Sequence, residues 1–375
     1  MTAPRLDVDL GRIEHNARTL VERLALRGIS VTGVTKAGLG SADIANALLR
    51  AGVSALGDSR MENIERMRRE QITAPISLIR SPMLSQVDRV VRSAELSLNT
   101  EWSVLKGLSS AAGQSGRSHA VLLMVELGDL REGIMPDDLA DMVQVVLRLP
   151  NITLIGIGAN LACHSGVVPD HNNMAELSAL AESIEQTFGM RLEMVSGGNS
   201  ANLDWALGAE DTGRINNLRL GEAILLGCEP LHRRPIEGLY TDAITLVAEV
   251  IEFKAKPARP WGAIAQTAFG QAPADAASGD RSRAILALGQ QDVDPAGLLP
   301  PAGIRILGAS GDHLITCADS GGPVVGDEVR FGLNYSALVR SMTSPYVLKA
   351  MNRNSAAGLC VSQTPECGVL SGRAG

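Results

Sequence analysis

Short apolar segments alternate with amphipathic helical segments through the first 230 residues, and this alternation limits the fold more than any other feature. The helical segments carry apolar residues at i, i+3, i+4 and i+7, whereas the apolar segments are rich in Val, Ile and Leu. The segments with a strand pattern are residues 29–36, 53–59, 76–81, 96–100, 119–127, 152–161, 193–200 and 216–224. Strictly alternating strands and helices favour an α/β fold with a parallel sheet covered by helices. Eight such units predict closure into a (β/α)8 TIM-type barrel, which typically takes about 250 residues.

The pattern changes after residue 230. Residues 231–347 contain short alternating segments with many Gly and Pro residues and few long helical patterns. They predict a smaller, mainly β C-terminal domain after a barrel of residues 1–230. A further helix is expected over residues 12–28, before the first barrel strand. Residues 348–375 lack sustained periodicity and are expected to form a flexible tail.

Composition and charge exclude several classes of partner. The chain has 41 acidic and 34 basic residues, a net charge of −7 and no block of Lys and Arg, which argues against binding nucleic acid or an anionic membrane. No stretch reaches the roughly 18 apolar residues of a membrane span, and the first ten residues carry charges that a signal peptide would not have, so a cytoplasmic protein is expected. The five cysteines are widely spaced without a CxxC pair, so neither a disulfide framework nor a metal site is expected.

Candidate functional residues lie where the predicted barrel strands end, because barrels of this kind carry their chemistry there. Lys36 ends the first strand, and a cation that loses its hydration must be paired, deprotonated or bonded. SGGNSAN (196–202) follows the seventh strand and offers backbone N–H groups and the Ser200 hydroxyl to an anion. LRLGEA (218–223) follows the eighth strand and adds a second glycine turn beside Arg219.

Each of these features also has an ordinary structural explanation. Glycine turns mark tight loops more often than phosphate sites, Arg219 alone could form a structural ion pair, and Lys36 alone could extend to the barrel rim. Strands one, seven and eight are neighbours in a closed barrel, however. The lysine, the glycine turns and the arginine at the ends of these strands therefore favour one shared site. A lysine that faces a phosphate site suggests a Schiff base with pyridoxal 5′-phosphate. IGIGAN (155–160) matches half of a dinucleotide-binding fingerprint, but its last glycine and a ribose-binding carboxylate are missing.

Longer stretches of the sequence resemble the alanine racemase family of fold-type III pyridoxal-phosphate enzymes, and more closely its alanine/ornithine racemase branch. These stretches are GDSRMENI (57–64), ELGDLREGI (126–134), GANLAC (158–163) and FGLNYSALVRSMTSPYV (331–347). The resemblance runs from about residue 5 to residue 347. It implies a pyridoxal-phosphate-dependent amino-acid racemase that exchanges the Cα proton of ornithine, another small or basic amino acid, or alanine. It also implies a homodimer with shared active sites.

The resemblance assigns cofactor-binding roles to individual residues. Lys36 matches the lysine that forms the Schiff base, and Arg219 matches the arginine that hydrogen-bonds the pyridine nitrogen. Asn160 falls where alanine racemases have a histidine in contact with the ring. The phosphate-binding positions match Ser200 and the backbone of Gly221 and Glu222.

The resemblance also assigns substrate-binding roles. Arg131 matches an arginine that helps to place the substrate carboxylate, and Tyr335 matches a tyrosine near the substrate. Gly311 and Asp312 match the segment that reaches the site of the neighbouring subunit. These residues are therefore expected to contact the amino acid rather than the cofactor.

The sequence departs from the family pattern at two positions. Alanine racemases have a phosphate-contacting tyrosine four positions after the lysine, where this chain has Gly40. They also have a proton-exchanging tyrosine, supplied by the partner subunit, where this chain has Gln290, and an amide is no general base near neutral pH. We hypothesise that one further residue takes this second catalytic role, and the candidates are Tyr335, Asp292, Asp312 and His313.

Other functions of the same fold type stay open at this stage. A non-catalytic pyridoxal-phosphate-binding or homeostasis protein would use the same lysine, but such proteins usually end after the barrel. A fold-type III decarboxylase would carry a CESCD-type motif in the second domain, and TCAD (316–319) is a poor substitute. A metal-assisted aldolase would need a His/Cys/Asp cluster there, for which His313, Cys317 and Asp319 are weak candidates. Asp292 or Asp294 could pair with the ammonium group of a basic substrate.

Overall fold

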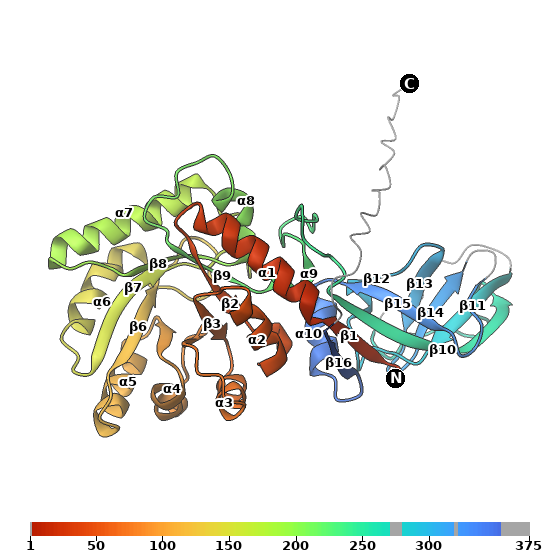
Figure 1. Ribbon diagram of the computed structural model, residues 1–375. Coiled ribbons are helices and arrows are strands. Elements are labelled where there is room, and N and C mark those ends of the chain that lie inside the picture. The colour runs from red at the N-terminus through yellow and green to blue at the C-terminus, as the bar shows by residue number, and fades with distance from the viewer. Residues whose placement is uncertain (1, 271–279, 319–321, 354–375) are drawn as a thin grey trace.

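The computed structural model describes residues 2–270, 280–318 and 322–353, and its N-terminal part is a closed barrel of eight parallel strands (Figure 1). Neighbouring strands pair in chain order, and the last strand pairs with the first through Thr32 and Arg219. The barrel strands are β2 (Ser30–Val34), β3 (Ala55–Asp58), β4 (Ile76–Leu78), β5 (Leu96–Asn99), β6 (His119–Met124), β7 (Ile152–Gly158), β8 (Met194–Gly198) and β9 (Asn217–Leu220). The predicted (β/α)8 barrel is confirmed.

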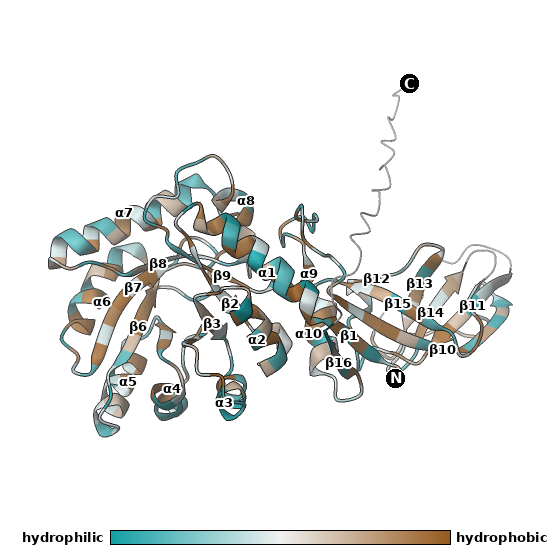
Figure 2. Cartoon of the chain, viewed as in Figure 1, coloured by the Kyte–Doolittle hydropathy of each residue, from teal (hydrophilic) through white to brown (hydrophobic). Residues whose placement is uncertain are grey.

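Helices surround the barrel, and their polar faces point outward. Figure 2 shows hydrophobic residues along the barrel strands and hydrophilic residues on the outer helices. The helices are α1 (Leu10–Ala25), α2 (Ala42–Arg50), α3 (Met61–Arg69), α4 (Val87–Ser93), α5 (Trp102–Gln114), α6 (Leu139–Val146), α7 (His171–Phe188), α8 (Leu203–Ala206) and α9 (Glu222–Leu226). Asp9 caps α1 by accepting hydrogen bonds from the backbone N–H groups of Gly11 and Arg12. In the described part of the chain, no helix combines the length and the apolar character that crossing a membrane requires.

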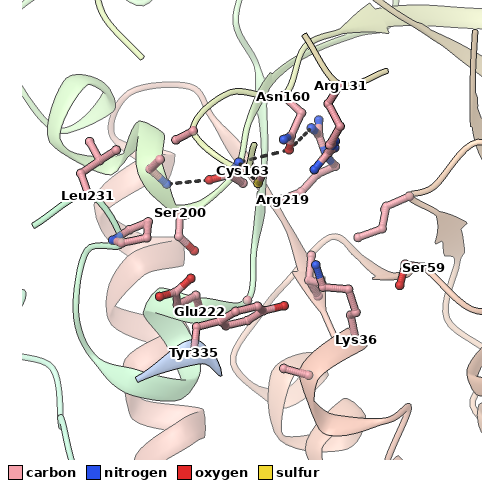
Figure 3. Close-up of a pocket in the computed structure, with 18 of the residues that line it drawn as sticks. Lys36, Ser59, Arg131, Asn160, Cys163, Ser200, Arg219, Glu222, Leu231 and Tyr335 are labelled. Carbon is pink, nitrogen blue, oxygen red and sulfur yellow. Dashed lines mark hydrogen bonds between the residues drawn. The ribbon is translucent and has the colours of Figure 1, made fainter. Parts of the chain in front are cut away.

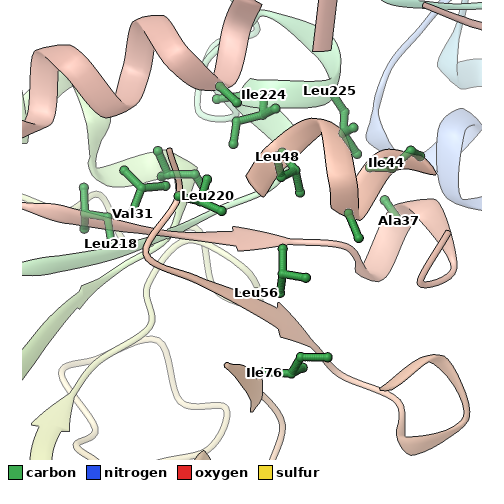
Figure 4. Close-up of a cluster of buried hydrophobic side chains, with 14 of the residues drawn as sticks. Val31, Ala37, Ile44, Leu48, Leu56, Ile76, Leu218, Leu220, Ile224 and Leu225 are labelled. Carbon is green, nitrogen blue, oxygen red and sulfur yellow. The ribbon is translucent and has the colours of Figure 1, made fainter. Parts of the chain in front are cut away.

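The barrel core forms where strand side chains meet the inner faces of the helices. Leu56 on β3 and Leu220 on β9 are fully buried, and Ile44 and Leu48 of α2 pack in the same cluster (Figure 4). Burying one such side chain stabilises the fold by about 1.5–3 kcal/mol. The apolar face of α2 and the apolar side chains of the strands are therefore buried together in one core.

The C-terminal domain is a mainly antiparallel sheet that also recruits the N-terminus of the chain. Its strands are β10 (Ile244–Pro257), β11 (Asp280–Leu286), β12 (Leu298–Leu299), β13 (Ile304–Ala309), β14 (Leu314–Ala318), β15 (Glu328–Leu333) and β16 (Leu348–Asn352). The strand β1 (Arg5–Asp9) pairs antiparallel with β10 and parallel with β16. Arg5 reinforces this pairing through a bidentate contact with Glu328 on β15.

These pairings correct two of the boundaries expected from the sequence. Residues 5–9 belong to the C-terminal sheet and not to the barrel, and residues 348–352 form β16 where the start of a flexible tail was expected. Neither strand has a neighbour close in sequence, so local periodicity could not reveal the pairing. The rest of the expected tail, residues 354–375, lies outside the described residues.

Candidate active site

A pocket of about 830 Å³ opens at the C-terminal ends of the barrel strands (Figure 3). Its wall gathers side chains from distant parts of the sequence. The predicted site residues that line it are Lys36, Arg131, Asn160, Ser200, Arg219, Gly221, Glu222 and Tyr335. Strand β9, the loops after β2, β6, β7, β8 and β9, and one helix of the C-terminal domain supply them, so the pocket depends on both domains.

Lys36 begins a 3₁₀ turn, Lys36–Gly38, directly after β2, and its side chain is exposed at the pocket instead of buried as the sequence suggested. The residue before this turn is held in place, because the Thr35 hydroxyl donates a 2.7 Å hydrogen bond to the buried carboxylate of Asp58. Asp58 also accepts a hydrogen bond from the side-chain amide of Asn63. Burial raises the pKa of Asp58, although these donors oppose the shift.

Gly40 closes the same turn in a left-handed conformation with φ of +64°. A Cβ atom at this position would lie 2.7 Å from Cβ and 2.8 Å from the backbone oxygen of Asn63. No side chain fits there without moving the backbone. The glycine that replaces the tyrosine of alanine racemases is therefore a requirement of the local packing in this chain.

Arg219 lies on β9 with 7% of its surface exposed, and it donates hydrogen bonds only to neutral oxygens in the described structure. Its acceptors are Ser196 Oγ, the backbone oxygen of Ala159 at 2.7 Å and Asn160 Oδ1 at 3.5 Å. Burial lowers the pKa of Arg219 to about 10, so the guanidinium stays protonated near neutral pH. It is a fixed positive charge that can only donate hydrogen bonds.

The opposite end of the pocket is built from two short turns. Ser200 begins a 3₁₀ turn after β8, is 3% exposed, and accepts a 3.1 Å hydrogen bond from the backbone N–H of Ala223. Gly198, which precedes this turn, has φ of +147° and would place a Cβ 2.2 Å from the side chain of Asn202. Gly221 packs against Val34 of β2, where a Cβ would lie 3.1 Å from the valine Cβ. These close approaches leave backbone groups and one hydroxyl facing the pocket, as phosphate binding requires.

Tyr335 reaches the pocket from α10 (Tyr335–Thr343) of the C-terminal domain. Lys36 Nζ lies 5.5 Å from the centroid of the Tyr335 ring, within the range of a cation–π contact. Asn334 caps the helix by accepting a hydrogen bond from the backbone N–H of Ala337. The cap fixes the start of α10, so Tyr335 is held beside Lys36 (Figure 3).

Arg131 lies on the loop after β6, and two acidic residues organise this loop. Glu126 accepts hydrogen bonds from backbone N–H groups within the loop, and the fully buried Asp129 accepts hydrogen bonds from those of His164 and Ser165. The carboxylate of Asp129 therefore ties the Arg131 loop to the loop after β7. Within the pocket, the guanidinium of Arg131 donates to both carboxylate oxygens of Glu132.

The other predicted site residues lie outside this pocket. Asp292 is buried and accepts hydrogen bonds from the Ser344 hydroxyl and the backbone N–H of Gly289. Gly311 and Asp312 lie in the turn between β13 and β14, where Asp312 is 73% exposed and contacts His313. Their proposed roles stay predictions. The same holds for the weak metal cluster, since Asp319 lies outside the described residues.

Sequence reasoning missed residues that act on the backbone instead of on a ligand. Glu229 is 3% exposed, and its carboxylate accepts hydrogen bonds from the backbone N–H groups of Leu231, His232 and Arg234. Burial would raise the pKa of Glu229, but these donors outweigh burial and the pKa is lowered. Glu229 thereby folds the loop that covers one side of the pocket. The position of Asp129 after a barrel strand was the one sequence feature that could have indicated its role. For Glu229 no sequence pattern indicated a role.

The pocket residues fit pyridoxal phosphate. Asn160 Nδ2 is buried without a hydrogen-bond partner in the described part of the chain, and Arg219 donates beside it. The glycine-lined turns at Ser200 and Gly221 match a phosphate group, and Lys36 lies on another wall of the same pocket. An unpaired amide donor, two glycine turns beside a buried hydroxyl and a lysine amine therefore line one pocket, and these are the groups that such a cofactor needs.

Comparison with known proteins identifies the family of the chain. The sequence model of the family described as alanine racemase, N-terminal domain, matches residues 8–230. The chain is 37% identical over 351 residues to a lysine racemase of Thermotoga maritima, a match that covers 93% of this chain and 98% of the relative. It is also 37% identical over 353 residues to an ornithine racemase of Acetoanaerobium sticklandii, and this match covers 93% of this chain and 99% of the relative.

The chain belongs to the alanine racemase family. Solved structures agree on the fold that members of this family share. The alanine racemase of Streptomyces lavendulae superposes with a TM-score of 0.73 at 18% identity, covering 95% of this chain and 99% of that chain. A D-threonine aldolase of Filomicrobium marinum reaches 0.72 at 15% identity, with coverage of 91% and 89%. Because a racemase and an aldolase fit almost equally well, the fold alone does not select the reaction.

Proposed function

We propose that this protein is a pyridoxal-phosphate-dependent amino-acid racemase whose substrates are basic amino acids of the ornithine and lysine type. The observation that carries the proposal is the convergence of Lys36, Arg219 and Ser200 on one pocket at the C-terminal barrel ends. The match to lysine and ornithine racemases over 93% of the chain supports this reaction over decarboxylation or cofactor storage.

Each pocket residue has a part in this reaction. Bound pyridoxal phosphate would draw electrons from the Cα of the attached amino acid and make its proton acidic. Lys36 would hold the cofactor and then carry the Cα proton on one face of the substrate. Arg219 would face the pyridine nitrogen as a hydrogen-bond donor, and because a guanidinium cannot accept, the nitrogen would stay unprotonated there. Ser200 and the backbone of Gly221 and Glu222 would bind the phosphate.

A second proton-carrying group must act on the opposite face. Tyr335 contacts Lys36 and so lies on the lysine side, where it positions the amine. Gly311 and Asp312 are carried on a turn outside this pocket, and Asp312 is largely exposed. We therefore propose a homodimer in which this turn completes the pocket of the neighbouring subunit, with Asp312 as the leading candidate for the second group. Asp292 is less suited because both carboxylate oxygens are already bonded.

A cytoplasmic location is part of the proposal. The cysteines that the structure describes, Cys163, Cys228 and Cys317, are all free thiols. Free thiols are typical of proteins that work in a reducing compartment. Fractionation of cells that express the protein would test the location.

Incubation with single L-amino acids in D₂O tests the reaction. A racemase exchanges the Cα proton for deuterium and forms the D-enantiomer, a decarboxylase releases CO₂, and a storage protein does neither. We expect exchange with inversion for ornithine and lysine, and its loss in Lys36→Ala. Release of CO₂, or cofactor binding without Cα exchange, would contradict the proposal.

A further inference from the structure

We propose that Glu132 selects amino acids that carry a side-chain ammonium group, an inference that rests on the racemase function proposed above. Among the described residues that line the pocket, the acidic ones are Glu132 and Glu222. Glu222 already forms an ion pair with Arg233. Burial raises the pKa of Glu222, although Arg233 opposes the shift. Glu132 is also paired, but its partner Arg131 is the residue expected to bind the substrate carboxylate, so Glu132 can be released for a cation that enters the pocket.

Glu132 is paired with the residue that is expected to bind the substrate carboxylate. Nε and Nη2 of Arg131 both donate to the Glu132 carboxylate, which forms a bidentate pair between consecutive residues. The side chains of Arg131 and Glu132 are 38% and 25% exposed, so both are partly dehydrated. Burial lowers the pKa of Arg131, but its pairing with Glu132 outweighs burial and the pKa is raised.

A substrate carboxylate competes with Glu132 for the same N–H groups of Arg131. When the substrate takes them, Glu132 loses its partner, and a partly buried carboxylate without a cation is costly. The ammonium group of ornithine or lysine supplies a new partner, because its three or four methylene groups let both ends reach neighbouring side chains. Alanine has no such group and leaves Glu132 unpaired. One internal ion pair is thus exchanged for two pairs with a basic substrate.

The acidic residues that the sequence suggested for this role are engaged elsewhere. Asp292 holds Ser344 and the backbone of residue 289. Asp294 accepts a hydrogen bond from the Ser336 hydroxyl and caps the 3₁₀ turn after it. Neither lines the pocket of its own chain. In the part of the chain that the structure describes, the side chain of Glu132 pairs with Arg131 itself.

The first test compares ornithine with norvaline, which has the same carbon chain without the ammonium group. We expect Glu132→Gln to lower kcat/KM for ornithine about tenfold, or about 1.4 kcal/mol, and to raise that for norvaline, because no carboxylate is then left unpaired when the substrate takes Arg131. Glu132→Asp keeps the charge and should retain most of the ornithine preference. Asp137→Asn removes one exposed charge from the same segment outside the pocket and serves as the matched control.

The second test measures binding without turnover. The probe 5-aminovalerate has a carboxylate and a distal ammonium but no α-amine and no Cα centre to racemise, and valerate lacks both amines. Calorimetry on the cofactor-loaded protein should show 5-aminovalerate bound about tenfold tighter than valerate in wild type, and equally in Glu132→Gln.

The outcomes separate this inference from the proposed function. If Glu132→Gln weakens ornithine and norvaline by the same factor, Glu132 only positions Arg131 and the specificity role is overturned. Equal binding of 5-aminovalerate and valerate to wild type would overturn it too. If wild type racemises no amino acid, the racemase proposal fails, whereas the binding test still decides whether Glu132 recognises a distal ammonium.

Discussion

Replacing Gly40 by alanine would test how tightly the turn that carries Lys36 is packed. Gly40 has φ of +64°, and its missing Cβ would lie 2.7, 2.8 and 3.0 Å from Cβ, O and Cα of Asn63. Gly116 is a matched control, because its φ is +62° and nothing lies within 4 Å of its Cβ position. The two substitutions therefore share the left-handed backbone and differ in the steric clash.

The magnitudes follow from these geometries. A left-handed conformation costs an alanine about 1–2 kcal/mol, partly offset by the lower entropy of the unfolded chain, so Gly116→Ala should destabilise by about 1 kcal/mol. Overpacking against Asn63 adds roughly 1–3 kcal/mol, because two of the clashing atoms belong to the backbone and cannot rotate away. Gly40→Ala should therefore destabilise by about 2–4 kcal/mol.

Urea unfolding of both variants measures this difference in the free energy of unfolding. Cofactor titration adds a second readout, since movement of the Lys36 turn should weaken pyridoxal-phosphate binding in Gly40→Ala and not in Gly116→Ala. Equal destabilisation of the two variants would refute the claim that Asn63 leaves no room at residue 40. The absence of tyrosine there would then need another explanation.

Other predictions concern single buried groups. Burial lowers the pKa of His119 to about 4, so the folded protein should lose about 3 kcal/mol of stability as pH falls from 6.5 to 4. Urea unfolding at several pH values measures this loss, and His119→Gln should reduce the dependence of the free energy of unfolding on pH. Ser200→Ala should weaken pyridoxal-phosphate binding about tenfold, or about 1.4 kcal/mol, measured by absorbance titration; the urea midpoint should fall as well, because the backbone N–H of Ala223 loses its acceptor. Asp129→Asn should raise KM more than it lowers kcat, because the loop of Arg131 loosens; an unchanged KM would contradict the anchoring role.

Local patterns were sufficient to predict the barrel and much of its pocket. Strand and helix periodicities depend on which side of each element is buried. The order of apolar and polar residues within one short segment indicates that side. Once a closed barrel is expected, strand ends share one rim, so Lys36, Ser200 and Arg219 were expected to meet there, and all of them line the pocket.

The tertiary structure alone decided the features that depend on contacts between distant residues. The strand β1 pairs with β16 although more than 330 residues separate Arg5 from Leu348, and α10 brings Tyr335 to Lys36 from the other domain. The pairing of Arg131 with Glu132 inside the pocket was equally invisible, because adjacent residues in a loop have no fixed relative direction. Sequence periodicity records burial along one element, whereas these contacts are set by how separate elements pack, and that information is spread over the whole chain.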